Sequence, residues 1–196
     1  VLSGPKKIGY ISLPSFYTEW DDNESSSCAN DIAKEIIKLK RENIEGLIFD
    51  LRYNGGGSLQ EAVDISGIFI EAGPMSIIKE REGKKQTLKD PSRGSIYDGP
   101  LVVMVNGQSA SASELVAATL QDYNRAIILG SPTFGKATMQ VVYPLDSAFN
   151  PEAVAKGLSG TDNRKQIKDF LKITTGALFR ISGSSNQFNG VIPDIG

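Results

Sequence analysis

The stretch Glu45-Gly-Leu-Ile-Phe-Asp-Leu-Arg-Tyr-Asn-Gly-Gly-Gly-Ser58 decides the fold of this chain. Its apolar first half, residues 45–51, predicts a buried β-strand, and the consecutive glycines that follow predict a tight turn. Ser58 and Glu61 have the spacing of a capping box, which predicts the start of a helix over residues 59–70. A strand, a glycine turn and a helix in immediate succession are typical of an α/β fold.

The same alternation continues on both sides of this stretch. The hydrophobic pattern predicts strands at residues 7–13, 76–82, 85–89, 101–105, 126–130 and 138–143, and helices at residues 27–40 and 111–122. Residues 17–27 indicate a polar loop, and residues 146–169, with no clear period, indicate a long connection. We expect one α/β domain over residues 1–196, closed by a pair of strands at 170–174 and 177–181.

Composition excludes several classes of site and partner. Histidine is absent, which excludes a Ser-His-Asp triad and leaves a serine activated by a lysine as the main alternative for a hydrolase. The 21 basic and 23 acidic residues leave no charge excess that would attract nucleic acid or an anionic membrane. Cys28 is the single cysteine, so we expect no internal disulfide, and a chain without histidine cannot assemble an ordinary structural zinc site.

The length and hydropathy of the chain are those of a soluble protein. The length suits one large domain or two small lobes that bury a core without disulfides. No apolar run approaches the roughly 20 residues that span a bilayer. Residues 1–7 lack the architecture of a signal peptide. We therefore expect no transmembrane segment, and we expect any targeting segment to have been removed.

The motif Ser109-Ala-Ser-Ala-Ser-Glu114 contains a candidate nucleophile. Ser111 directly follows a predicted strand and opens a predicted helix, where free backbone N–H groups and the positive end of the helix dipole favour a developing oxyanion. The alternative is that Ser111 only caps the helix together with Glu114. Ala110 and Ala112 leave room for a substrate backbone beside the hydroxyl, but the motif by itself leaves both interpretations open.

Lys136 is a candidate general base within the stretch Phe134-Gly-Lys-Ala-Thr-Met-Gln140. It follows a predicted turn, which allows its amine to point into the interior, and burial favours the neutral amine that a base requires. In an extended strand Lys136, Thr138 and Gln140 share one face, so the Gln140 amide oxygen could hold the lysine in position. A solvated lysine in a turn is the alternative interpretation.

The glycines at 55–57 offer consecutive backbone amides at the start of a helix, which suits an oxyanion hole and equally a phosphate. A second phosphate-binding pattern is present because Gly130-Ser-Pro-Thr-Phe-Gly-Lys-Ala137 fits GxxxxGK. Alanine stands there where a P-loop needs serine or threonine for magnesium, and a strand pattern follows instead of a helix. We therefore do not expect this chain to bind a nucleotide.

Taken together, DLRxNGGG, SASASE and FGK with a glutamine four residues later resemble the C-terminal processing peptidases, specifically their tail-specific protease branch. The resemblance extends through Ser66–Pro74, Leu120–Ala126 and Gly190–Ile195 and so covers nearly the whole chain. It implies a serine endopeptidase with a ClpP/crotonase-like layered α/β core and additional C-terminal strands. It also implies protein or peptide substrates selected by apolar C-terminal tails, a location in the cell envelope of bacteria, in the periplasm, and no cofactor.

The resemblance also assigns roles to residues of the site. It implies that Ser111 is the nucleophile, Lys136 the general base and Gln140 the residue that orients the lysine. The oxyanion hole is implied to be the amide of Ala112 and a glycine amide of the DLRxNGGG loop. We assign that glycine as Gly57, with Gly56 as the alternative.

The chain departs from the resembled family because it contains no recognisable PDZ domain and none of the flanking helical regions. We therefore interpret residues 1–196 as a peptidase catalytic core alone. Two other functions remain as alternatives. One is a non-catalytic peptide-binding or scaffold protein on the same fold. The other is a crotonase-type acyl-CoA enzyme, which also pairs two backbone amides but leaves the serine and lysine unexplained.

Overall fold

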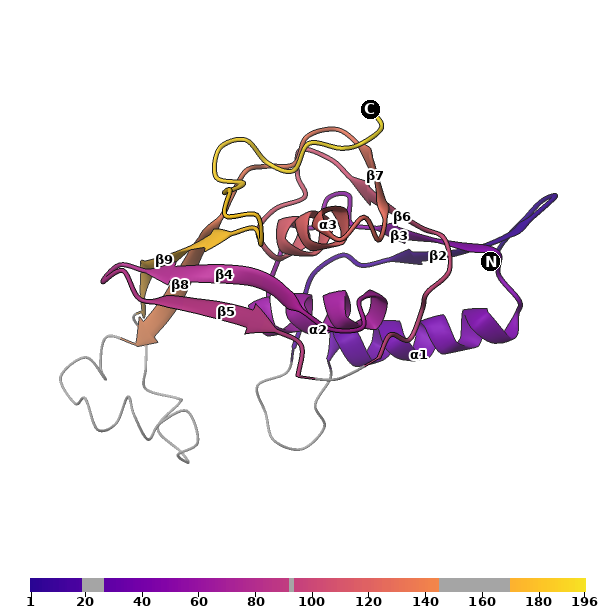
Figure 1. The fold of residues 1–196 in the computed structure, drawn as a ribbon, viewed down its shortest axis with the longest axis horizontal. Coiled ribbons are helices and arrows are strands. Elements are labelled where there is room, and N and C mark those ends of the chain that lie inside the picture. Colours follow the sequence, from indigo (N-terminus) through magenta and orange to yellow (C-terminus); the bar gives the residue numbers. More distant parts are fainter. Residues whose placement is uncertain (19–26, 92–93, 145–169) are drawn as a thin grey trace.

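The computed structural model describes residues 1–18, 27–91, 94–144 and 170–196 (Figure 1). The connection predicted at 146–169 lies outside these residues. Two sheets and three helices make up the described chain. The first sheet has the order β1(Leu2–Ser3), β2(Lys7–Ser12), β3(Gly46–Asp50), β6(Leu101–Val105), β7(Ile127–Gly130), and the second has the order β5(Lys85–Lys89), β4(Pro74–Glu80), β9(Phe170–Phe179), β8(Thr138–Pro144). The helices are α1(Cys28–Arg41), α2(Leu59–Phe69) and α3(Ala112–Asp122).

The first sheet is parallel from β2 through β3 and β6 to β7, with β1 antiparallel to β2. Parallel neighbours need crossover connections, and α1, α2 and α3 lie in these connections. The second sheet is antiparallel and extends beside the first (Figure 1). The predicted α/β fold is therefore confirmed, with an antiparallel sheet added to the parallel core.

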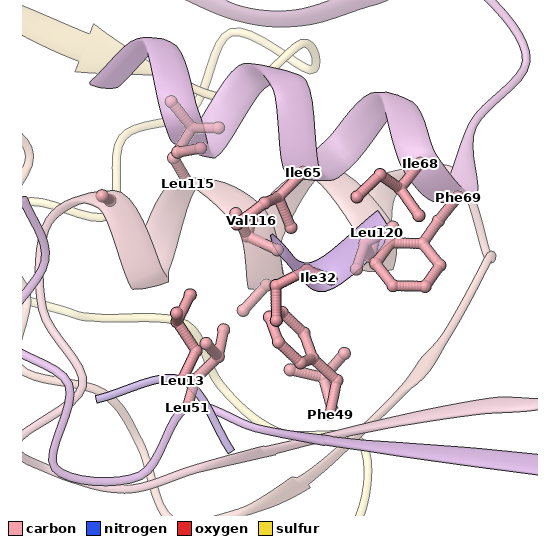
Figure 2. Packing of buried hydrophobic residues seen from close by; sticks show 14 of the residues in the cluster. Leu13, Ile32, Phe49, Leu51, Ile65, Ile68, Phe69, Leu115, Val116 and Leu120 are labelled. Carbon is pink, nitrogen blue, oxygen red and sulfur yellow. The ribbon is translucent and has the colours of Figure 1, made fainter. Parts of the chain in front are cut away.

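The main hydrophobic core lies between the parallel sheet and the helices. Phe49 from β3, Ile65 and Phe69 from α2, and Val116 and Leu120 from α3 face one another in it (Figure 2). Each of these five side chains is at most 2% exposed. Strand β3 is buried along almost its whole length, as expected of a central strand in a parallel sheet. This burial explains the continuous apolar run that precedes the glycine turn.

Two predictions about local structure are wrong in part. Residues 170–174 and 177–181 do not form a pair of strands, because β9 continues through Gly176 as one strand. It pairs with β8 along its length and with β4 at its end, and a register shift opposite Met139 and Gln140 absorbs the irregularity. Because β8 is the partner strand on both sides of Gly176, the chain does not reverse direction at that glycine.

The predicted capping box at α2 forms only by half. The Glu61 backbone N–H donates to Ser58 Oγ at 3.3 Å, but the Glu61 carboxylate turns to the other helix, α1. There its Oε2 accepts from Ala29 N at 2.8 Å, from Ser27 Oγ at 2.8 Å and from Cys28 Sγ at 3.3 Å. The free N–H groups at the start of α1 are buried and need an acceptor, and Glu61 supplies it.

No helix in the described ranges combines the length and apolar character needed to cross a bilayer.

Candidate active site

The candidate nucleophile stands at the junction of β6 and α3 in a conformation that few residues adopt. Ser111 is the residue before the helix and has φ 58° and ψ −111°. A non-glycine residue held in a sparsely populated backbone region costs about 1–3 kcal/mol and persists only where its surroundings fix it. Its carbonyl accepts from Leu115 N at 3.0 Å, and its own N–H donates to Glu114 Oε2 at 2.8 Å.

Glu114 does more than the capping role that the sequence predicts for it. Its side chain is buried, with 2% of the residue exposed, and each carboxylate oxygen accepts two hydrogen bonds. Oε2 accepts from the backbone N–H of Ser111 and of Lys136, each at 2.8 Å. Oε1 accepts from Thr133 Oγ1 at 2.6 Å and from Gly135 N at 2.7 Å. One carboxylate oxygen therefore brings the backbones of the two candidate dyad residues within about two hydrogen-bond lengths of each other.

Lys136 is partly buried, and it lines two hollows together with Ser111. One is a groove of about 650 Å³ that runs between the glycine loop and β8. The other is a small cavity of about 20 Å³ that shares Ser111, Lys136 and Leu178 with the groove. Ser111 Oγ and Lys136 Nζ form no hydrogen bond with each other in the described residues, and such bonds are often long in a site without substrate.

Gln140 also lines the groove. It lies on β8 with Thr138, whereas Lys136 lies two residues before that strand begins. The Gln140 side chain is exposed, and its Nε2 lies 3.5 Å from Thr174 Oγ1. Within the described part of the chain it makes no hydrogen bond to Lys136. Its role in orienting the lysine stays a prediction.

The glycine loop lies directly against Ser111, the candidate nucleophile. Gly56 has φ 102°, and a Cβ added to it would lie 2.8 Å from Ser111 Cβ and 3.1 Å from Ala112 N. The Gly56 N–H is already used, because it donates to Asn54 Oδ1 at 2.9 Å. The N–H groups of Gly57 and Ala112 donate to no acceptor among the residues that the structure describes. Two unpaired donors therefore stand on the two segments that flank Ser111.

Asn54 is a residue of the site whose importance the sequence did not reveal. It is fully buried, and its Nδ2 donates to Leu13 O at 2.8 Å. Its backbone carbonyl oxygen accepts from Ala110 N at 3.0 Å and from Ser113 Oγ at 2.8 Å. Asn54 thus connects the glycine loop to the turn that carries the candidate nucleophile. An asparagine beside glycines reads as an ordinary turn residue, so no local signal distinguished it.

The small cavity is lined by a second feature that sequence reasoning missed. Its lining includes apolar side chains from α3 and β9, among them Leu115 and Leu178, and the ion pair of Asp122 with Arg180. The two side chains of this pair are 13% and 17% exposed, and Arg180 Nε donates to Asp122 Oδ1 at 3.0 Å. Asp122 and Arg180 are 58 residues apart, so only the tertiary structure, which brings the residue after β9 to the end of α3, reveals the pair.

Asp50, at the end of β3, anchors the start of the glycine loop. It accepts from Arg52 Nη2 at 2.7 Å and from Tyr10 Oη at 2.6 Å. Burial by itself would raise the pKa of this carboxyl, but the hydrogen bonds from Arg52 and Tyr10 outweigh burial and hold the pKa below its ordinary value. A carboxyl whose pKa is lowered by folding stabilises the folded state above its unfolded pKa of about 3.9. That contribution is lost as the pH falls toward the folded pKa.

We expect Asp50→Asn to destabilise the chain at pH 7 by about 1–3 kcal/mol, because a buried, charge-assisted hydrogen-bond acceptor is removed. The difference from wild type should shrink as the pH falls below about 4, because the unfolded wild-type chain then binds a proton at Asp50 that the folded chain, with its lowered pKa, does not yet bind. Urea unfolding at pH 7 and pH 3 measures both effects. Asp31→Asn is the matched control, since Asp31 likewise binds a tyrosine hydroxyl and a basic side chain but is exposed. Equal losses in the two variants at pH 7 would contradict the prediction.

The family model described as Peptidase family S41 matches residues 7–196. The chain belongs to peptidase family S41. This S41 chain is 37% identical over 190 residues to the tail-specific protease of Haemophilus influenzae, covering 97% of the chain and 24% of that protein. It is 33% identical over 189 residues to the carboxy-terminal-processing protease of Bartonella bacilliformis, covering 96% of the chain and 38% of that protein.

Among solved structures, the photosystem II D1 C-terminal processing protease superposes on the S41 chain with a TM-score of 0.75 at 26% identity. The match covers 96% of the S41 chain and 42% of the other protein. The resemblance to the C-terminal processing peptidases is therefore confirmed, and so is the α/β fold. The chain spans less than half the length of these three relatives.

Proposed function

We propose that this chain is a serine endopeptidase that works through a Ser111/Lys136 dyad. Ser111 Oγ attacks the scissile carbonyl while the neutral amine of Lys136 accepts the hydroxyl proton. Lys136 then returns that proton to the leaving amine, and the peptide acyl group stays on Ser111 as an ester. A water molecule hydrolyses the ester, with Lys136 again acting as the base, and frees Ser111 for the next cycle.

The observation that carries this proposal is the arrangement of Ser111 and Lys136. Both line one groove, and their backbone N–H groups donate to the same buried oxygen of Glu114. A serine that only capped its helix would need neither the lysine beside it nor the positive φ that turns it toward the groove.

The two unpaired amides support an oxyanion hole formed by Gly57 N–H and Ala112 N–H. Preorganised donors of this kind stabilise the charge that develops on the carbonyl oxygen in the transition state. Gly56 is the weaker candidate, because Asn54 already accepts its N–H. A Gly56 amide that turned to the substrate would leave a buried amide oxygen of Asn54 without its partner.

The groove also bears on the substrate. It is bounded by β8, an edge strand of the second sheet, and such an edge can pair with an extended peptide by strand addition. Protein or peptide substrates agree with the names of the relatives. Selection of substrates by apolar C-terminal tails and a periplasmic location rest on the family resemblance and stay predictions.

Labelling with a fluorophosphonate probe tests the proposal. We expect covalent modification of the purified chain, mapped to Ser111 by peptide mass analysis, because an activated serine attacks phosphorus and displaces fluoride. Heat-unfolded protein is the control and should not react. An unlabelled native chain would favour the binding or scaffold alternative, and binding of coenzyme A would favour the crotonase-type alternative.

A further inference from the structure

Glu114 is a buried carboxylate whose hydrogen-bond partners are all uncharged. Its four donors are three backbone N–H groups and the hydroxyl of Thr133. Among the described residues no basic side chain forms an ion pair with it. Burying an ionised carboxylate is costly unless its lone pairs are satisfied, and here each oxygen accepts two hydrogen bonds. Such a group holds its donors firmly, because any donor that leaves exposes the remaining charge to an apolar surrounding.

The four donors come from two segments that are far apart in the sequence. Ser111 N belongs to the start of α3, whereas Thr133, Gly135 and Lys136 belong to the connection between β7 and β8. The Glu114 side chain therefore links the backbone of the candidate nucleophile directly to that of the candidate base, and the hydrogen bond from Phe134 N to Ser109 O at 3.0 Å joins the same two segments nearby. Because both backbones bind to the same oxygen, Oε2, moving the carboxylate would move both residues.

We propose that Glu114 is a positioning residue, which sets the separation of Ser111 and Lys136 without touching the substrate. This inference rests on the proposed function of the dyad. The positive φ of Ser111 supports it, since a strained conformation persists only when neighbouring groups fix it, and Glu114 accepts the Ser111 N–H. A capping residue alone would need to serve only its own helix.

Thr133 extends the same link away from the site. Its Oγ1 donates to Glu114 Oε1 at 2.6 Å and accepts from Val191 N at 2.6 Å. Val191 is fully buried, so this bond ties the carboxylate to the C-terminal segment. Thr133 makes no hydrogen bond with Ser111 or Lys136 in the described residues, and it can influence them only through Glu114 or the backbone. It therefore offers an independent test of the link.

The test is Glu114→Gln with peptidase kinetics. Glutamine has nearly the same shape but only one acceptor oxygen. Its NH₂ group must therefore face the donors that one of the two carboxylate oxygens accepts from in wild type. A displacement of about 1 Å in a catalytic group costs on the order of 10²-fold in rate. We therefore expect kcat to fall about 30- to 100-fold while KM changes less than about threefold, because the groove itself stays intact.

Glu61→Gln is the matched control. Glu61 is also a buried carboxylate, 5% exposed, that accepts a backbone N–H at a helix start, but it is not among the residues that line the two hollows with Ser111 and Lys136. We expect a comparable loss of melting temperature in both glutamine variants and a loss of kcat only in Glu114→Gln. Thr133→Val should lower kcat in the same direction but less, about 3- to 10-fold, and should add little to Glu114→Gln in the double variant.

Wild-type kcat in a folded Glu114→Gln variant would overturn the inference. So would equal losses of kcat in Glu114→Gln and Glu61→Gln, because the effect would then follow general stability. If Glu114→Gln does not fold, Thr133→Val decides, and an unchanged kcat in it overturns the inference. The proposed function fails by a different result, namely activity that survives replacement of Ser111.

Discussion

Replacing Ser111 with alanine is expected to abolish peptide hydrolysis. Removal of the nucleophile in serine peptidases lowers kcat by about 10⁴- to 10⁶-fold. The loss of stability should be no more than about 0.5–2 kcal/mol, the usual cost of a helix-capping serine, because alanine can replace serine at this backbone conformation with no new clash. The kcat of purified protein on an unfolded protein substrate, with urea unfolding beside it, measures both quantities.

Ser27→Ala is the control for the Ser111 experiment. Ser27 caps α1, where its Oγ accepts from Asn30 N at 3.3 Å, and it lies outside the groove. This variant should lose a similar amount of stability and keep its kcat. Peptidase activity that persists in Ser111→Ala, free of contaminating protease, would refute the assignment of the nucleophile and with it the proposed function.

Replacing Lys136 with arginine is expected to leave the chain nearly inactive although the positive charge is retained. Guanidinium stays protonated at every pH that the protein tolerates, so it cannot accept the proton of Ser111. Loss of general-base catalysis typically costs about 10²- to 10⁴-fold in rate. Gln140→Ala should lower kcat less, since it removes an orienting group and leaves the proton acceptor in place.

The pH dependence of kcat/KM tests directly whether the amine of Lys136 is the general base. In wild type kcat/KM should rise with pH, because a general base must be unprotonated to accept the serine proton. The residual activity of Lys136→Arg should lack this rise. Near-wild-type activity in the arginine variant would eliminate lysine as the general base.

Much of the fold could be predicted from hydrophobic periodicity and turn residues. The strand at 101–105 and the helix starting at residue 59 lie where the pattern predicts them, and β3 differs from its predicted range by one residue at each end. These elements have strong local signals, namely continuous apolar runs, a capping serine and consecutive glycines. The pattern predicts two strands in place of β9 because a glycine in a strand also reads as a turn, and only its pairing with β8 shows that the chain continues.

The sequence by itself determined which chemistry is open to this chain. The absence of histidine, the serine at a predicted helix start and the lysine after a glycine left a Ser/Lys dyad as the main candidate for a hydrolase. The sequence also indicates that Ser111 and Lys136 follow predicted strands, and functional groups of α/β folds gather at the ends of strands. Such inferences succeed because they depend on residue type and on local spacing.

Only the tertiary structure decided which acceptor serves which donor. Glu61 and Glu114 occupy equivalent positions in two capping-box patterns, yet Glu61 binds the start of α1, whereas Glu114 binds its own helix and the turn of Lys136. Local sequence fixes where unpaired N–H groups arise. The side chain that satisfies them depends on which segments, far apart in the chain, are buried together, since a buried donor or charge must find its partner within about 3 Å.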